Sequence, residues 1–117
     1  MRKKITTRSF KIPVEIEKKM NKKLVADGYG LRGKSKWICD AITHFLTQER
    51  EFCIECIEYA DDLVKLDKSV SFRPTEEVDE LLNEWVLITR KRMPILEGVK
   101  SKIIRASIFQ GLLLPTF

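Results

Sequence analysis

The sequence is poor in the residues that interrupt regular structure. Its 117 residues include only 5 glycines and 4 prolines, whereas 44% are hydrophobic and 33% are charged. Disordered chains have the opposite balance, so this composition indicates a globular protein. A chain of this length has room for one compact domain, which we expect to be mostly helical.

Long apolar runs and abundant cysteines are also missing. No stretch approaches the roughly 18 apolar residues that a membrane-spanning helix needs, and Met1-Arg2-Lys3-Lys4 leads into polar sequence, unlike a signal peptide. An odd number of cysteines, 3, argues against a secreted disulfide scaffold. We therefore expect a cytoplasmic protein with reduced thiols that does not bind membranes.

Catalytic and metal-binding motifs are absent as well. There is no Gly-rich phosphate loop and no nucleophile with a suitable histidine and acid, so we expect neither an enzyme nor a cofactor. Cys53 and Cys56 form a C-x-x-C pair, but no second pair follows, and a structural zinc site needs four ligands. We expect no metal site, buried cysteines, and a surface or partly buried helical position for His44.

Charge is distributed unevenly along the chain. Residues 1–46 carry 12 Lys/Arg against 4 Asp/Glu, residues 47–67 carry 2 against 7, and residues 68–117 carry 8 against 6. The three net charges, +8, −5 and +2, give the total of +5. This pattern indicates a polyanion-binding face in the first part and a solvated or partner-facing segment after it.

One segment of the sequence occurs twice. SFKIPVEIEKKM, which starts at Ser9, reappears as SFRPTEEVDELL at Ser71, 62 residues later. Further on, KSKWI at Lys34 corresponds to KSKII at Lys100, now 66 residues later. We expect the four extra residues to lie in the loop between the two helices of the second copy.

Each copy predicts a short strand, a helix, a loop and a second helix. Polar and apolar residues alternate around Ser71, which is typical of a strand with one buried face. Thr75 can cap the following helix, and Pro13 suits a helix start because its φ is fixed and it lacks an N–H. One such unit cannot bury its apolar faces alone, so we expect the strands to pair as an antiparallel ribbon over four helices.

The acidic residues 47–67 predict a connector helix between repeat 1, residues 5–46, and repeat 2, residues 68–114. Its expected apolar face consists of residues at helical spacing, namely Phe52, Cys56, Tyr59, Ala60 and Leu63.

The order of elements in each copy resembles the ribbon-helix-helix pattern of the MetJ/Arc superfamily. Each copy has a strand, SFKIP or SFRPT, then a helix, a loop and a second helix opening with Lys-Ser-Lys. The resemblance covers nearly the whole chain, twice over. Members usually build the ribbon from two chains, and a tandem within one chain is similar to the TraY-type relaxosome accessory proteins of conjugative plasmids. The fold class that this implies is mainly α with a two-stranded antiparallel β-ribbon, a tandem ribbon-helix-helix pseudo-dimer in one chain plus a connector helix.

The resemblance implies binding of double-stranded DNA, with the ribbon in the major groove. By position, the base-reading residues are Thr7, Ser9, Lys11, Ser69, Ser71 and Arg73, and the phosphate-binding residues at the starts of the second helices are Lys34, Ser35, Lys36, Lys100, Ser101 and Lys102. Arg2, Lys3 and Lys4 would add an arm on the backbone or minor groove. The alternatives are the solvated face of an ordinary strand and plain helix caps with solvated lysines.

Arg8 departs from the pattern, because it occupies the position of Val70 on the core face of the strand. Either it reaches the ribbon edge, or it pairs with an acidic residue of the connector, or the strand starts only at Ser9.

The two halves differ in their reading residues, so the DNA site should be asymmetric. The leading hypothesis is an accessory factor at a DNA-transfer origin, with a relaxase or another relaxosome component as partner. We expect a monomer in solution, of which several copies bind DNA. The alternatives are an autoregulatory transcriptional repressor and an antitoxin-like interaction module that uses the apolar residues 112–117. An intermolecular ribbon between two chains is the alternative arrangement.

Overall fold

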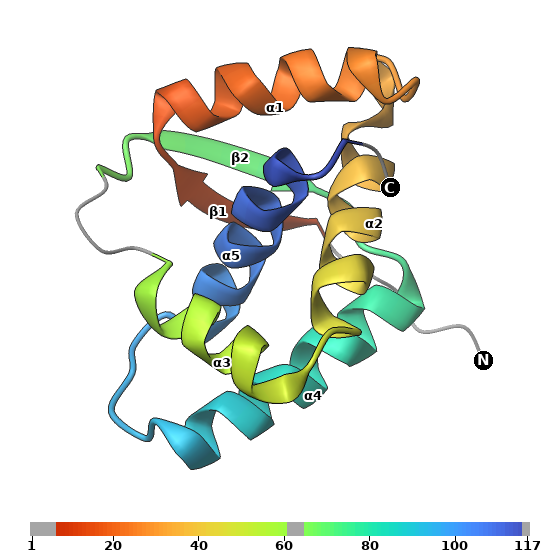
Figure 1. Ribbon diagram of the computed structural model, residues 1–117. Coiled ribbons are helices and arrows are strands. Elements are labelled where there is room, and N and C mark those ends of the chain that lie inside the picture. The colour runs from red at the N-terminus through yellow and green to blue at the C-terminus, as the bar shows by residue number, and fades with distance from the viewer. Residues whose placement is uncertain (1–6, 61–64, 116–117) are drawn as a thin grey trace.

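The computed structural model describes residues 7–60 and 65–115 of the chain. The described fold is mainly α with one two-stranded antiparallel sheet, as predicted (Figure 1). A 3-10 turn, Leu31–Gly33, precedes the second helix. The elements follow in the order β1 (Arg8–Ile12), α1 (Val14–Ala26), α2 (Lys34–Leu46), α3 (Arg50–Tyr59), β2 (Lys68–Phe72), α4 (Glu76–Arg92) and α5 (Val99–Leu113).

The β1–β2 ribbon is centred on two serines. Ser9 lies opposite Ser71, with Phe10 opposite Val70 and Lys11 opposite Ser69. Ser71 is also the sequence counterpart of Ser9, so the two residues at the centre of the ribbon are equivalent positions of the two repeats. Successive residues of a strand point to opposite faces, and this register turns the apolar set of both strands to the same side.

The core lies between the ribbon and the helices. The buried ribbon side chains are Phe10, Ile12, Val70 and Phe72, and the two phenylalanine rings meet edge to face with centroids 5.9 Å apart. Helix α5 packs against α1, α2, α3, α4 and β1, which explains why most of its side chains are buried. Each large apolar side chain buried in this way stabilises the fold by about 1.5–3 kcal/mol.

The expected position of the four extra residues is wrong. Helix α1 has 13 residues and α4 has 17, so the additional residues lengthen the helix instead of the loop. The physical reason is that Trp85 and Thr89 extend the buried stripe of α4 by a further turn. The helix then ends at Arg92, shortly before Pro94, because the residue before a proline disfavours the helical conformation.

Helix α3 is shorter than the expected connector helix and turns a different face inward. It spans 10 residues, Arg50–Tyr59, and its buried side chains are those of Cys53, Ile54 and Ile57. Phe52 is 39% exposed and Tyr59 is 58% exposed, so the predicted apolar face is wrong for these residues, while Ala60 is buried as expected. Leu63 lies outside the described residues. Both stripes have helical spacing, and packing against α2 and α5 distinguishes them.

The helix starts follow the local chemistry of the sequence. The Thr75 hydroxyl accepts a hydrogen bond from the backbone N–H of Val78 at 3.2 Å and caps α4, as predicted. Pro13 occupies the position just before α1, with φ −62°, and its carbonyl accepts from the N–H of Ile16 at 3.0 Å. Within residues 7–60 and 65–115, no helix combines the length and the apolarity needed to cross a membrane.

Candidate nucleic-acid interface

The structure brings the six expected base-reading residues together on one face of the ribbon. All six are exposed: Thr7, Ser9, Lys11, Ser69, Ser71 and Arg73. At the centre, the hydroxyls of Ser9 and Ser71 lie 2.9 Å apart in a hydrogen bond across the strands. None of the six is acidic, so this face offers hydroxyl donors and acceptors together with two cations.

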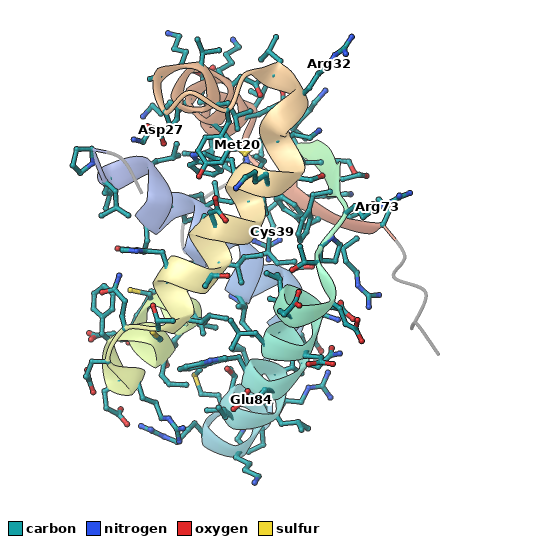
Figure 2. All side chains as sticks on the ribbon, turned by 90° about the vertical axis from the view of Figure 1, so that its right-hand side faces the viewer. Met20, Asp27, Arg32, Cys39, Arg73 and Glu84 are labelled. Atoms are coloured by element: carbon teal, nitrogen blue, oxygen red, sulfur yellow. The ribbon has the colours of Figure 1, made fainter. Side chains whose placement is uncertain are left out.

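The two cations of this face lie at opposite ends of the ribbon. Lys11 is opposite Ser69 near one end, whereas Arg73 directly follows β2 at the end where Thr7 precedes β1. Figure 2 shows the Arg73 side chain directed away from the helices. The same figure shows α3 on the opposite side of the molecule from the ribbon. The ribbon face is therefore open, with a positive charge at each end.

The start of α2 lies at the Arg73 end of the ribbon. The Ser35 hydroxyl accepts a hydrogen bond from the Arg73 backbone N–H at 3.0 Å, and the Cys39 thiol lies 3.9 Å from the Arg73 carbonyl oxygen. Lys34 is half-buried, and Lys36 is exposed with its Nζ 3.6 Å from a carboxylate oxygen of Asp40. Two lysines of the expected phosphate-binding set therefore flank this end.

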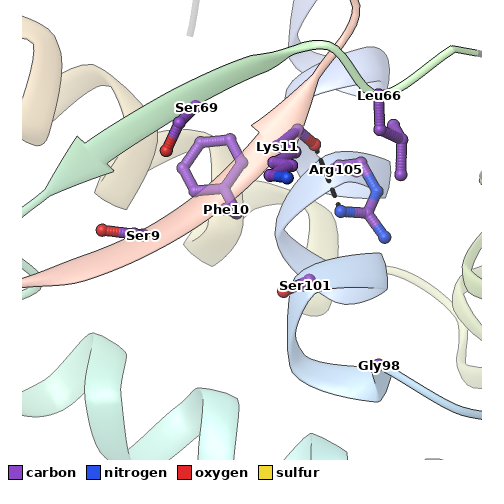
Figure 3. Close-up of a pocket in the computed structure, with 8 residues that line it drawn as sticks. All are labelled: Ser9, Phe10, Lys11, Leu66, Ser69, Gly98, Ser101 and Arg105. Atoms are coloured by element: carbon purple, nitrogen blue, oxygen red, sulfur yellow. Dashed lines mark hydrogen bonds between the residues drawn. The ribbon is translucent and has the colours of Figure 1, made fainter.

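The start of α5 lies at the other end of the ribbon, next to Lys11. The guanidinium of Arg105 donates from Nη1 to the Lys11 carbonyl oxygen at 3.1 Å (Figure 3). An open pocket of about 380 Å³ lies beside this contact, and its lining includes Ser9, Ser69 and Ser101. Lys100 is half-buried, and its Nζ donates to the Asn83 side-chain carbonyl at 2.9 Å and lies 3.9 Å from a carboxylate oxygen of Asp79. Lys102 is half-buried on the same turn.

Arg8 belongs to β1 and forms a buried ion pair. Its guanidinium donates to both carboxylate oxygens of Asp79, at distances from 2.9 to 3.2 Å. The Arg8 side chain is 34% exposed and that of Asp79 is 4% exposed. The expected pairing of Arg8 with an acidic residue of the connector is wrong, because its partner Asp79 lies on α4. The strand also does not start only at Ser9, since β1 begins at Arg8. Pairing offsets the cost of a charge on the core side of the ribbon.

Sequence reasoning missed two residues of this region, Asp79 and Arg105. Both are buried, with 3% and 5% exposure. A signal for Arg105 was present, since it is the only charged residue in the apolar stretch 103–114. Asp79 carried no signal, because an acid near a helix start is ordinary.

The loop between α1 and α2 is held by a network of side chains. The Trp37 indole N–H donates to Asp27 at 3.0 Å, and Lys23 donates to the same carboxylate at 2.9 Å. The Tyr29 hydroxyl donates to Asp40 at 2.5 Å. Burial and the Asp40 carboxylate raise the pKa of Tyr29 to about 12, so the phenol stays protonated. These contacts fix the start of α2 relative to α1.

The cysteines are free thiols in mostly buried positions. Cys53 donates from Sγ to the Phe45 carbonyl oxygen at 3.1 Å, and burial raises its pKa to about 11. Burial also raises the pKa of Cys39 and of Cys56. His44 is exposed on α2. Across the described ranges, no three His, Cys, Asp or Glu side chains are grouped so that they could hold a metal ion.

No protein-family model, curated protein or solved structure matches this chain. Any assignment of function therefore depends on the chemistry of the ribbon face and its surroundings.

Proposed function

We propose that this protein binds double-stranded DNA sequence-specifically, as a tandem ribbon-helix-helix in one chain with the β1–β2 ribbon in the major groove. The observation that carries the proposal is the exposed ribbon face, on which six hydroxyl-bearing or cationic side chains and no acid are aligned. A two-stranded ribbon fits the major groove, where Arg and Lys bind guanine O6 and N7. Serine and threonine hydroxyls bind several bases, so the centre of the ribbon can read sequence as well.

The helix starts at the two ends of the ribbon support the proposal. Free backbone N–H groups and the helix dipole make such starts favourable for phosphates. At the α2 start, Lys34 and Lys36 add charge, and Ser35 links this start to Arg73 through its hydrogen bond to the backbone. Lys36 stays exposed although it pairs with Asp40, whereas Lys100 at the α5 start is half-buried between Asn83 and Asp79. We therefore expect stronger phosphate binding at the α2 end.

The difference in phosphate binding between the α2 and α5 ends, together with the different base-reading residues, favours an asymmetric DNA site. The first strand presents Thr7, Ser9 and Lys11. The second strand presents Ser69, Ser71 and Arg73. A relaxase must nick one defined strand, and an accessory factor that marks a direction suits that need. We propose this role at a DNA-transfer origin, while an autoregulatory repressor would use the same ribbon on an operator.

Selection from a library of random DNA duplexes tests the proposal. The wild-type protein is expected to recover one asymmetric motif at both low and high salt, with weaker binding at high salt because counterions are released from the phosphates. Lys11→Ala/Arg73→Ala should bind the selected site about tenfold more weakly or worse and lose its sequence preference, since each good base contact is worth about 1–3 kcal/mol.

The matched control removes the same two charges elsewhere. Arg90 and Lys91 are exposed in the last turn of α4, away from the ribbon. Arg90→Ala/Lys91→Ala should keep the wild-type motif. Absence of any selected motif, or selection of the same motif by Lys11→Ala/Arg73→Ala, would contradict the proposal.

A further inference from the structure

Two exposed helix faces of this molecule carry opposite charges in a similar arrangement. On α1, Lys19, Lys22 and Lys23 line a surface pocket of about 320 Å³ together with Ala26 and Leu112. On α3, Glu51, Glu55 and Glu58 line a pocket of about 280 Å³ whose walls also include Ile54, Tyr59 and Arg92. We call these two surfaces the α1 face and the α3 face.

Each face has two charged side chains without an ion pair in the part of the chain that the structure describes. Lys23 pairs with Asp27, and Glu51 pairs with Arg92. Within residues 7–60 and 65–115, Lys19 and Lys22 on one face and Glu55 and Glu58 on the other make no ion pair. Two unpaired cations and two unpaired anions at adjacent turns are therefore presented on surfaces of similar length.

Both faces also expose apolar surface beside the charges. Leu113 is 77% exposed next to the α1 face, and Tyr59 is 58% exposed on the α3 face. In both views of the molecule, α1 lies along the top and α3 toward the bottom, and in Figure 2 the ribbon lies to the right of both (Figures 1 and 2). Contact through these faces leaves the ribbon uncovered.

We propose that the α3 face of one copy of this protein docks on the α1 face of a second copy. The charge complementarity of the two faces identifies the occupant, because the unpaired glutamates match the unpaired lysines in number and spacing. The contact joins two different surfaces, so each added copy leaves one α1 face and one α3 face free, and association continues beyond a dimer. Ion pairs at exposed sites are weak and screened by salt, so the association is weak at physiological ionic strength.

Light scattering and analytical ultracentrifugation of the full chain without DNA test this inference. The average mass is expected to rise with protein concentration at about 50 mM salt, and the association should weaken at least tenfold at about 500 mM salt. Lys19→Glu/Lys22→Glu and Glu55→Lys/Glu58→Lys should each remain monomeric. The variant with all four substitutions should associate again, because both charges of the contact are exchanged.

The matched control for Glu55→Lys/Glu58→Lys is Glu80→Lys/Glu84→Lys, which makes the same change in net charge on exposed positions of α4 and should associate like wild type. Helical circular dichroism and thermal melting show whether each variant is folded. A wild-type protein that stays monomeric at low salt would overturn the inference. A dimer that persists in both two-residue face variants would also overturn it, since that contact would lie elsewhere. None of these outcomes depends on DNA binding, so they are distinct from failure of the proposed function.

Discussion

The ion pair between Arg8 and Asp79 shows how one charge is accommodated on the core side of a strand. Its counterpart position in the second strand holds Val70, which is buried without any partner. Asp79 is 4% exposed and accepts both guanidinium donors of Arg8. Buried pairs of this kind are costly to break, because the remaining charge keeps its desolvation penalty.

We expect Asp79→Leu to lower the free energy of unfolding by about 1–3 kcal/mol, a value below that of a fully buried pair because Arg8 is one-third exposed. Arg8→Val/Asp79→Leu should recover most of this loss, since it removes both charges and places a valine where the second strand has Val70. Urea unfolding of both variants measures the difference. A double variant less stable than Asp79→Leu would contradict this account.

The cysteines give a second prediction at the scale of single residues. Burial raises the pKa of Cys53 to about 11, above the ordinary thiol value of about 8.5. Because the folded state disfavours the thiolate, native thiols should react with a disulfide reagent at pH 8 far more slowly than in urea. Because the folded state favours the protonated thiol, the contribution of this thiol to stability is present below pH about 8.5 and is lost as the pH rises toward 11.

The rate of reaction with the reagent is the measurement for this prediction. Cys56, which is only half-buried, should react first, and Cys56→Ala should remove that fastest phase. Equal rates for native and unfolded protein would show that the thiols are accessible.

Two equivalent serines at the helix starts act differently on the ribbon. The Ser35 hydroxyl accepts from the Arg73 N–H, and Ser101 makes no such bond among the described residues. We expect Ser35→Ala to destabilise the protein by about 0.5–1.5 kcal/mol, the usual net value of one hydrogen bond. Ser101→Ala at the equivalent position should be close to neutral. Urea unfolding compares the two, and equal losses would mean that the hydrogen bond does not stabilise the ribbon end.

The elements could be predicted from the sequence wherever a local signal was strong. Alternation of polar and apolar residues fixed both strands, and the helix start at Thr75 followed from its capping side chain. The inward face of α3 was not predictable, since Phe52 and Cys53 both belong to stripes with helical spacing. The length of α4 was missed because the repeat shows that residues are added but not whether they extend a helix or a loop.

The residues of the candidate site could also be predicted where a local sequence signal was strong. Ser9, Lys11 and Ser71 could be assigned to the exposed face because strand alternation and the repeat agree. The partners of Arg8 and Lys100 depend on which helices meet in three dimensions, and no local pattern contains that information. The packing of α4 against α5, near the ribbon, supplied it.

At the scale of the whole molecule, the proposed binding of DNA through the ribbon makes the asymmetry of the ribbon face the property that would most limit the DNA site. The ribbon is nearly two-fold symmetric about the Ser9–Ser71 pair, and the six proposed base-reading residues differ between the strands at two positions. Thr7 stands where the second strand has Ser69, and Lys11 stands where it has Arg73. If base contacts from these residues set the direction of the site, then removing the two differences should remove much of the direction.

Thr7→Ser/Lys11→Arg makes both strands present Ser, Ser and Arg. We expect this variant to select a more palindromic motif than wild type from the same random library, because identical half-ribbons favour identical half-sites. The substitutions conserve charge, so the dependence of binding on salt should not change. Unequal phosphate contacts at the starts of α2 and α5 would leave a residual preference outside the central bases. Selection of the unchanged wild-type motif would mean that direction is read from the flanking contacts alone and not from the ribbon.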